Sequence, residues 1–373
     1  METSGISWMF SFITRVFVTF TGWIATHLFE EQRGTPVEDV VDEDFCLNNT
    51  LSMESRVSTD GTGENAPSVW VVMIGYNYID DTLASFDSLK QSTGVDIKYV
   101  FVDKGSSDDS HRVVLEKVPE ADVIWIKDNV GFARANNVGI AHAMERGADY
   151  ILMINNDIEA ESDMVRKLVA EAESDRGVGI VVPKIYYHGH RKVIWSAGCR
   201  YRKFPPIIKL NDGEDTGQYN DLRDVEFVTT CCLLIKREVI EKIGLLDPNC
   251  FLYWEDYDLS VRVREAGYTM RLVHEALLYH KVSLTTQKGK PNPGVWKIRG
   301  RSKAVFCRTH PAYGAICYPG YPLVANLGFL VSGKRSIIAA FNEGYREGKT
   351  GVLKPIPKWT DENEDKGEVL RTV

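Results

Sequence analysis

The side chains of this chain that could do chemistry gather in three acidic clusters, at Asp103, at Asn155-Asn156-Asp157 and at Glu255-Asp256-Tyr257-Asp258. A carboxylate directly after a strand, as expected of Asp103, can accept a hydrogen bond from the N–H of a nucleotide base, or it can close its own turn. An aspartate in the position of Asp157 is a natural ligand for Mg²⁺, which takes one or two carboxylates and completes its shell with phosphate and water. In the third cluster, neighbouring carboxylates raise the pKa of one member and supply a base.

Two further groups could contact anions. Gly131 opens an expected helix that carries Arg134, and the N-terminus of such a helix can hold phosphate or ribose, although a lone arginine there is commonly a surface charge. His280 follows a strand and is a candidate for binding metal or phosphate, with a structural role as the alternative. Helix capping is the alternative for the acidic residues at 255–258, but three carboxylates beside Trp254 exceed what a cap needs.

Apolar strands alternate with helices in the first half of the chain. Strands are expected at 69–74, 98–102, 123–126 and 150–154, and helices at 82–91, 107–118 and 132–146, with Ser106 or Ser107 as a cap. This alternation predicts an α/β fold whose parallel sheet is covered on both faces. Ligands of such sheets bind outside the carboxyl ends of the strands, where Asn77, Asp103 and Asp157 are expected.

The second half has longer loops, with further strands expected at 179–185, 225–228 and 233–235 and helices at 237–243 and from Glu255 to Gly267. Residues 311–352 are expected to form a C-terminal helical extension. Its apolar stretch at 318–341 predicts an interfacial helix pair with Lys334 and Arg335 facing lipid head groups, or else a tail that packs on the core. Residues 353–373 are charged and are expected to be disordered.

Residues 1–67 are expected to lie outside the fold. The stretch at 8–29 is apolar except for Arg15, which fits either a membrane anchor or a disordered extension. A third possibility is that translation starts at Met53. The segment at 35–68 is acidic and polar and is expected to be a linker.

Composition excludes several classes of protein. A net charge of −8 and a pI near 5.6 argue against a nucleic-acid binder, which needs a surplus of lysine and arginine. The seven cysteines show no Cys-x-x-Cys spacing, so neither a zinc site nor a disulfide framework is indicated, and a reducing cytoplasm fits best. Adjacent Cys231 and Cys232 are expected to be small buried hydrophobes.

A series of short motifs in a fixed order carries a resemblance to a known family. The motifs lie at 75–77, 102–106, 129–139, 155–157, 194–198, 253–262 and 280–281. Each is weak alone, but together they are specific. Over residues 69–310 the chain resembles inverting family 2 glycosyltransferases of the GT-A fold, and is most similar to their rhamnosyltransferase-like branch. The resemblance implies a GT-A domain at 68–310, with a Rossmann-like, mostly parallel sheet flanked by helices and followed by a helical appendage.

The resemblance also implies roles for single residues. Asp256 would be the general base, with Glu255 beside it, and Asp157 and His280 would hold a divalent cation, Mg²⁺ or Mn²⁺. The nucleotide-sugar donor would lie against Tyr76, Asn77, Asp103, Gly131, Arg134, Asn137, Asn156 and Trp195, and the acceptor against Trp254 and Asp258. The donor would be of the dTDP or UDP type and the acceptor a glycan or a lipid-linked glycan. The enzyme would work in the cytoplasm, on the cytoplasmic face of a membrane.

Four positions depart from the family pattern. Gly75 stands where Asn or Thr is usual, Lys104 where Asn is common, Thr230 where Gly is usual, and Gly300 where Asn often follows Arg299. The first two bear on the choice of donor nucleotide, and Thr230 bears on the acceptor side. A catalytically silent sugar-nucleotide binder or partner-binding protein is the alternative, which the retained acidic residues disfavour.

Overall fold

A computed structural model of the protein describes residues 67–203, 206–221, 223–282, 292–313, 321–331, 333–360 and 367–371. The apolar stretch at 8–29 and the alternative start at Met53 lie outside these residues, as does nearly all of the linker at 35–68. The predictions made for them therefore stay predictions.

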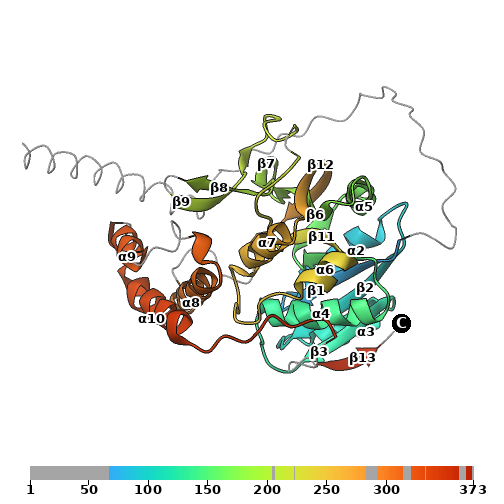
Figure 1. The fold of residues 1–373 in the computed structure, drawn as a ribbon. Helices are drawn as coiled ribbons and strands as arrows, with labels where there is room; N and C mark the ends of the chain where they lie inside the picture. Colours follow the sequence, from blue (N-terminus) through green and yellow to red (C-terminus); the bar gives the residue numbers. More distant parts are fainter. Residues whose placement is uncertain are drawn as a thin grey trace, which may run out of the picture.

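A mixed sheet forms the centre of the molecule (Figure 1). Its strands are β1 (Val69–Gly75), β2 (Ile97–Lys104), β3 (Ala121–Ile126), β4 (Tyr150–Asn155), β5 (Ile158–Ala160), β6 (Val178–Tyr187), β7 (His190–Ser196), β10 (Gly213–Glu214), β11 (Cys232–Lys236), β12 (Thr269–His280) and β13 (Glu368–Arg371). The order is β10-β7-β6-β11-β4-β1-β2-β3-β13, with β12 beside β5 and β6. A separate hairpin consists of β8 (Cys199–Lys203) and β9 (Pro206–Leu210).

The first four of these strands run parallel, and their register decides where the polar residues lie. β1 pairs in parallel with β2 and β4, so that Gly75 lies opposite Asp103 and Ile74 opposite Asn155. β11 runs antiparallel between β4 and β6. The carboxyl ends of β1, β2 and β4 therefore meet at one edge of the sheet, which confirms the predicted α/β architecture.

The helices are α2 (Ile79–Lys90), α3 (Ser110–Lys117), α4 (Phe132–Glu145), α5 (Met164–Glu173), α6 (Arg237–Ile243), α7 (Glu255–Glu265), α8 (Pro293–Thr309), α9 (Tyr321–Val331) and α10 (Ile338–Thr350). The predicted helix at 237–243 has those bounds. The helix expected at 107–118 begins at Ser110, because Asp109 is left-handed with φ of 55°. Ser106 and Ser107 hold a neighbouring turn and do not cap this helix.

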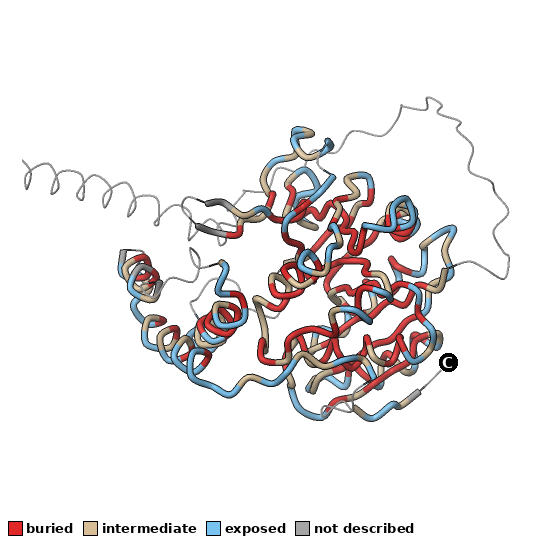
Figure 2. Tube along the Cα trace, viewed as in Figure 1, coloured by how far each residue is buried: buried red, intermediate tan, exposed pale blue. Residues whose placement is uncertain are grey.

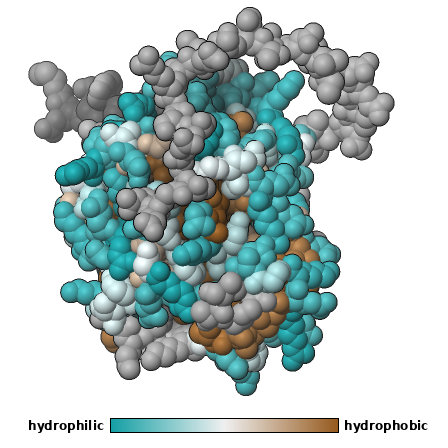
Figure 3. All heavy atoms as spheres, turned by 90° about the vertical axis from the view of Figure 1, so that its right-hand side faces the viewer, coloured by the Kyte–Doolittle hydropathy of each residue, from teal (hydrophilic) through white to brown (hydrophobic). Residues whose placement is uncertain are grey.

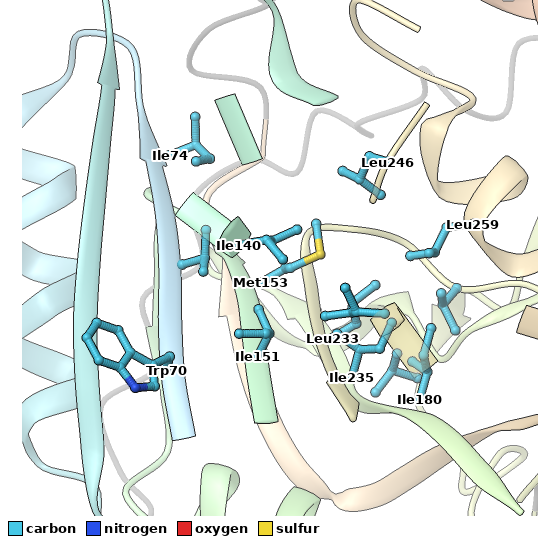
Figure 4. Close-up of a cluster of buried hydrophobic side chains, with 14 of the residues drawn as sticks. Trp70, Ile74, Ile140, Ile151, Met153, Ile180, Leu233, Ile235, Leu246 and Leu259 are labelled. Atoms are coloured by element: carbon cyan, nitrogen blue, oxygen red, sulfur yellow. The ribbon is translucent and has the colours of Figure 1, made fainter. Parts of the chain in front are cut away.

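Both faces of the sheet are buried, and the side chains of β1 alternate between two hydrophobic clusters. Trp70, Val72 and Ile74 join side chains from α4, α6 and α7 on one face (Figure 4). Val69, Val71 and Met73 face α2, α3 and α5 on the other. The strands are accordingly almost wholly buried (Figure 2), whereas the side of the molecule in Figure 3 is mostly hydrophilic. Cys231 and Cys232 are buried in the second cluster, as expected of small hydrophobes.

The C-terminal helices lie together on one side of the molecule, with α7 between them and the sheet (Figure 1). α8 and α10 cross closely because glycines stand at their contact: a Cβ at Gly300 would lie 2.3 Å from the carbonyl oxygen of Phe341, and one at Gly344 would lie 1.8 Å from that of Lys297. The first of these distances explains why asparagine cannot occupy position 300 here. Among the described residues, no helix is long and apolar enough to cross a membrane.

α9 combines a packed side with an exposed one. Phe329 packs edge-on against Trp296 of α8 and against Phe341 of α10, so part of α9 belongs to a small core of its own. On the other side, Leu323 is 75% exposed and Leu330 is 44% exposed. The helices thus show features of both predicted alternatives, a packed tail and an apolar surface.

The expectation that 353–373 is disordered is wrong for its described part. The backbone N–H of Lys354 donates to Asn249 Oδ1 at 2.8 Å, and that of Leu245 donates to the carbonyl oxygen of Pro357 at 2.9 Å. β13 then pairs antiparallel with β3, after the chain has run back across the molecule (Figure 1). The charged composition did not predict this strand, because β13 pairs with β3 through backbone hydrogen bonds and such pairing needs few apolar side chains.

Cys307 on α8 is disulfide-bonded, whereas Cys199, Cys231, Cys232 and Cys250 are free and buried. The sequence spacing gave no sign of this bond, because a single disulfide within a tertiary contact has no spacing rule. The expectation of a protein without disulfides therefore needs this correction.

We expect Gly344→Ala to lower the free energy of unfolding by about 1–3 kcal/mol, because the new methyl group forces α8 and α10 apart. Urea unfolding monitored by circular dichroism measures the loss. Gly189→Ala is the control, since a Cβ there would meet no atom within 4 Å. Equal stability of the two variants would show that the crossing tolerates separation.

Candidate active site

Two turns at the carboxyl edge of the sheet are tied together. The backbone N–H of Asn77 donates to Ser106 Oγ at 2.8 Å, and the backbone N–H of Ser107 donates to Asn77 Oδ1 at 2.8 Å. Asn77 and Tyr78 both have left-handed backbones, with φ of 61° and 60°. Such a conformation costs on the order of 1–3 kcal/mol per residue and persists where the surroundings impose it, commonly at binding sites.

Asp103 has a different environment from the one expected. It is fully buried; Oδ1 accepts from the backbone N–H of Ser106 at 2.9 Å, and Oδ2 lies 3.0 Å from His111 Nδ1 and accepts from the backbone N–H of the same residue. The His111 ring in turn stacks on Trp125 at 5.2 Å. Closure of the turn, the alternative considered for this carboxylate, is thus what the structure shows, and contact with a nucleotide base stays a prediction.

Lys104, one of the departures, lies beside Tyr76. Its Nζ is 4.3 Å from the centre of the Tyr76 ring and 3.5 Å from Asn129 Oδ1. Burial lowers the pKa of Lys104 to about 8, although the charge of Asp103 opposes the shift. An amine that stays mostly charged at neutral pH therefore stands at the end of β2.

The structure brings together the two residues expected to bind metal. His280 Nε2 lies 3.1 Å from Asp157 Oδ1, and the Trp195 ring stands edge-on to the imidazole at 4.6 Å. All three come from different strands or turns at the same edge. His280 Nδ1 is buried and has no hydrogen-bond partner among the described residues. A buried orphan of this kind is expected where a ligand completes the site.

These residues fit a divalent cation. Among the described residues no group of three His, Cys, Asp or Glu side chains is placed to hold a metal ion. Asp157 and His280 would therefore supply two ligands, and phosphate oxygens and water would supply the rest, as Mg²⁺ commonly requires.

Four more residues were expected to contact the donor, and the structure shows each of them against another part of the protein. Asn137 is buried and is joined to the backbone N–H and carbonyl oxygen of Leu246, both at 2.9 Å, so it clamps α4 to the loop after α6, and contact with a nucleotide stays a prediction. Gly131 permits close packing, since a Cβ would lie 2.5 Å from the carbonyl oxygen of Phe251. Asn156 donates to Thr82 Oγ1 at 2.8 Å, and Arg134 Nε donates to the carbonyl oxygen of Pro248 at 3.3 Å.

The third cluster lies at the start of α7. Tyr253 and Trp254 are left-handed, with φ of 67° and 72°, and a second strained pair therefore precedes Glu255 and Asp256. Glu255 is 4% exposed, and its Oε2 is buried without a hydrogen-bond partner among the described residues. Burial, followed by the negative charge of Asp256, raises the pKa of Glu255 well above its usual value. Its surroundings therefore favour the neutral form of Glu255.

Thr230 and Cys231 join the two carboxylate clusters. A hydrogen bond with the side chain of Thr230 partly offsets the rise in the pKa of Glu255. The backbone N–H of Asn155 donates to the carbonyl oxygen of Cys231 at 2.9 Å. The departure at 230 thus places a hydroxyl group against the buried acid, where glycine would leave none.

Asp258 was expected to contact the acceptor, and the structure shows internal partners for its carboxylate. It is 2% exposed, its Oδ2 lies 2.8 Å from Arg262 Nε, and its Oδ1 lies 2.7 Å from His310 Nε2. Hydrogen bonds from His310 and the charge of Arg262 lower the pKa of Asp258 despite its burial. Asp258 therefore links α7 to His310 at the end of α8, and its contact with an acceptor stays a prediction. Trp254, in contrast, packs on Phe306 of α8 at 5.1 Å and lies under Lys303.

Comparisons with known proteins agree with this geometry. Residues 70–244 match the sequence model of glycosyl transferase family 2. The chain contains a family 2 glycosyltransferase domain. Residues 70–244 thus belong to the glycosyltransferase class, and relatives of this domain include proteins named as rhamnosyltransferases, as the sequence motifs suggested.

Relatives of the glycosyltransferase domain cover about half of the chain or more. The uncharacterized protein y4gI of Sinorhizobium fredii is 27% identical over 59% of this chain, but the chain spans only 25% of that protein. An N-acetylglucosaminyl-diphospho-decaprenol L-rhamnosyltransferase of Mycobacterium tuberculosis is 23% identical over 53% of this chain and 71% of its own length. Among solved structures, GalNAc-T7 with UDP, GalNAc and Mn²⁺ matches with a TM-score of 0.50 and 17% identity, over 75% of this chain and 56% of that one. This likeness confirms the GT-A fold.

Sequence reasoning missed several residues around the site. His111, Arg262 and His310 hold the carboxylates of Asp103 and Asp258, and no local motif marks them. Only the four-residue spacing from Asp258 to Arg262 within one helix was readable as an ion pair. The other two partners are brought in by tertiary packing.

We expect Glu255→Gln to become progressively more stable than the wild type as pH rises from 5 to 7. Above a pH of about 4.3 the unfolded chain releases the Glu255 proton while the folded protein keeps it, so folding stability falls by up to about 1.4 kcal/mol per pH unit. Glutamine does not titrate and removes this slope. Urea unfolding at several pH values measures the difference, with the exposed Glu116→Gln as control. Parallel pH profiles for Glu255→Gln and the wild type would contradict a protonated Glu255.

Proposed function

We propose that this glycosyltransferase moves a sugar from a dTDP- or UDP-type nucleotide sugar to a hydroxyl group of a glycan or lipid-linked acceptor, with inversion at the anomeric carbon. Two connected polar centres support this proposal. The centres are Asp157–His280 and Glu255–Asp256, and they are connected through Thr230 and Cys231. One centre suits a diphosphate with its metal, and the other suits a hydroxyl that must lose a proton. A single displacement needs both in one site.

Asp157 and His280 would hold the divalent cation, which supplies positive charge that stabilises the departing diphosphate. Trp195 packs against His280 and fixes the plane of the imidazole. The cation and donor class are supported by GalNAc-T7, which was solved with UDP, GalNAc and Mn²⁺. Asn77 and Lys104, at the ends of β1 and β2, would lie beside the nucleotide.

The two neighbouring acids, Glu255 and Asp256, differ in burial, and this difference suggests a separate role for each. Burial and the charge of Asp256 raise the pKa of Glu255 and favour its neutral form, and its buried carboxyl group is poorly placed to meet a substrate. The base is therefore Asp256, which is more exposed and whose Oδ1 accepts from the backbone N–H of Tyr257 at 2.8 Å. Asp256 would take the proton of the acceptor hydroxyl as this oxygen attacks the anomeric carbon.

The membrane is the proposed place of action, on its cytoplasmic face. The mycobacterial relative is named for an acceptor that carries a decaprenol chain. In this chain, α9 presents exposed leucines at 323 and 330, which suit peripheral contact with a bilayer surface.

We expect Asp256→Asn to reduce sugar transfer by about 100- to 10,000-fold, because the amide cannot accept the proton of the acceptor. Donor binding should be nearly unchanged. Transfer is measured with radiolabelled donor and binding by calorimetry. Glu255→Gln, which mimics the protonated acid, is the matched control and should retain most of its activity. A dead Glu255→Gln beside an active Asp256→Asn would place the base one residue earlier, and two active variants would refute the proposed mechanism.

We also expect Asp157→Ala to abolish transfer and remove the effect of Mn²⁺ on donor affinity, because the cation loses its carboxylate ligand. Calorimetric titration of UDP with and without Mn²⁺ measures this effect. Glu159→Ala is the control: it lies two residues away and pairs with Arg191 at the surface. Full turnover of the wild type in excess EDTA would refute the metal assignment.

A further inference from the structure

Positive charge gathers on the side of α8 that faces the start of α7. The Arg299 guanidinium lies 4.4 Å from the centre of the Tyr253 ring and 5.1 Å from that of Trp296. One turn further along α8, Lys303 Nζ lies 4.5 Å above the Trp254 ring, and this lysine is only 4% exposed. We call Arg299, Lys303 and the nearby Lys334 the α8 cation cluster.

Lys334 belongs to the cluster through its electrostatics. It directly precedes the short 3₁₀ turn at Arg335–Ile337, and burial together with the positive charge of Arg299 lowers its pKa. The two positive charges therefore lie close enough to act on one another, which places Lys334 beside Arg299.

Arg299 has a hydrogen-bond donor without an acceptor among the described residues. Its Nε is buried and has no hydrogen-bond partner, and its guanidinium is paired with no carboxylate, among the described residues. The acids nearest along the helix pair are engaged elsewhere, since Glu343 and Glu347 both bind Lys297, at 2.7 and 2.8 Å. An arginine fixed between two aromatic rings, with an unsatisfied N–H, is preorganised to bind an anion.

The position of the cluster links it to the reaction. Arg299 and Lys303 lie over Tyr253 and Trp254, the strained pair that immediately precedes Glu255 and Asp256. Ser302 Oγ also donates to the carbonyl oxygen of Leu252 at 3.0 Å, which ties α8 to this loop. The cluster therefore stands on the α8 side of the proposed base, away from the Asp157–His280 centre at the strand ends.

An apolar surface continues from the cluster. Trp296, which the guanidinium of Arg299 contacts, packs on Phe329 of α9. α9 is apolar along its described length and exposes Leu323 and Leu330. The α8 cation cluster, which could bind a phosphate group, thus lies next to the apolar surface of α9, which could bind a hydrocarbon chain.

We propose that Arg299, Lys303 and Lys334 bind the diphosphate of a lipid-diphosphate-linked acceptor, whose hydrocarbon chain lies along α9. The inference rests on the proposed function and names its acceptor class. The diphosphate accepts hydrogen bonds from the guanidinium of Arg299, and the sugar attached to it extends past Trp254 to Asp256. The enzyme thereby selects acceptors by an anion that takes no part in the displacement.

Calorimetric titration of the full chain with geranyl diphosphate tests the proposal. UDP and Mg²⁺ are kept saturating, so that the donor site is filled. We expect Arg299→Gln to weaken geranyl diphosphate binding by about 10- to 100-fold, the loss of charge-assisted hydrogen bonds. Arg301→Gln removes the same charge from an exposed position two residues away and should bind like the wild type. Lys334→Gln, outside α8, serves as a second variant should Arg299→Gln not fold.

Two further ligands distinguish a lipid diphosphate from free pyrophosphate as the bound anion. Geraniol, which lacks the diphosphate, and inorganic pyrophosphate, which lacks the chain, should each bind at least 10-fold more weakly than geranyl diphosphate. Pyrophosphate binding as tightly as geranyl diphosphate would overturn the assignment to a lipid, and equal affinities of Arg299→Gln and Arg301→Gln would overturn the site. UDP binding is measured first in every variant. Its absence in the wild type would refute the proposed function, whereas normal UDP binding without an effect of Arg299 refutes only this inference.

Discussion

The buried carboxyl group of Glu255 is the constraint on which the arrangement of the site depends. Glu255 begins α7, where the helix dipole favours negative charge, yet burial and the neighbouring acids raise its pKa and favour the neutral form. The group can then be buried at the cost of one unsatisfied oxygen, Oε2, in place of a full charge. Because Glu255 is held inside against Thr230, the next residue must face outward, and Asp256 takes the exposed position.

The same constraint explains the strain before α7. To enter the helix with Glu255 inside, the chain passes through two left-handed residues, Tyr253 and Trp254. Their rings are held from outside by α8, through Arg299 and Lys303, while Asp258 binds α7 to His310 at the end of α8. The C-terminal helices therefore do more than follow the glycosyltransferase domain: they hold the loop that carries Asp256, the proposed base. This link to α8 also makes the close crossing of α8 and α10 at Gly344 relevant to the site.

Periodicity was sufficient to predict the sheet, because the strands are buried on both faces and read as apolar runs, as at β1 and β4. The motifs also located the two polar centres. They could not separate residues that face a ligand from residues that clamp the fold: Asp103, Asn137 and Asp258 belong to the same motifs as Asp157 and Asp256, but their partners are internal. These partners, such as His111, Leu246 and His310, come from distant or adjacent elements that only packing brings close. Charge composition failed for the tail for a related reason, since β13 is held by backbone groups.

The last strand has a consequence for how the molecule behaves in a crowded solution. Without β13, β3 would be the outer strand of the sheet, and its unpaired N–H and carbonyl groups beside Val123 and Ile124 would be a template for strands of other molecules. The chain thus covers β3 with a strand of four residues, so that a short strand replaces a longer one as the outer strand of the sheet. Any extension, tag or proteolytic cut at this terminus acts on the barrier to self-association, far from the chemistry and without touching a single residue of the site.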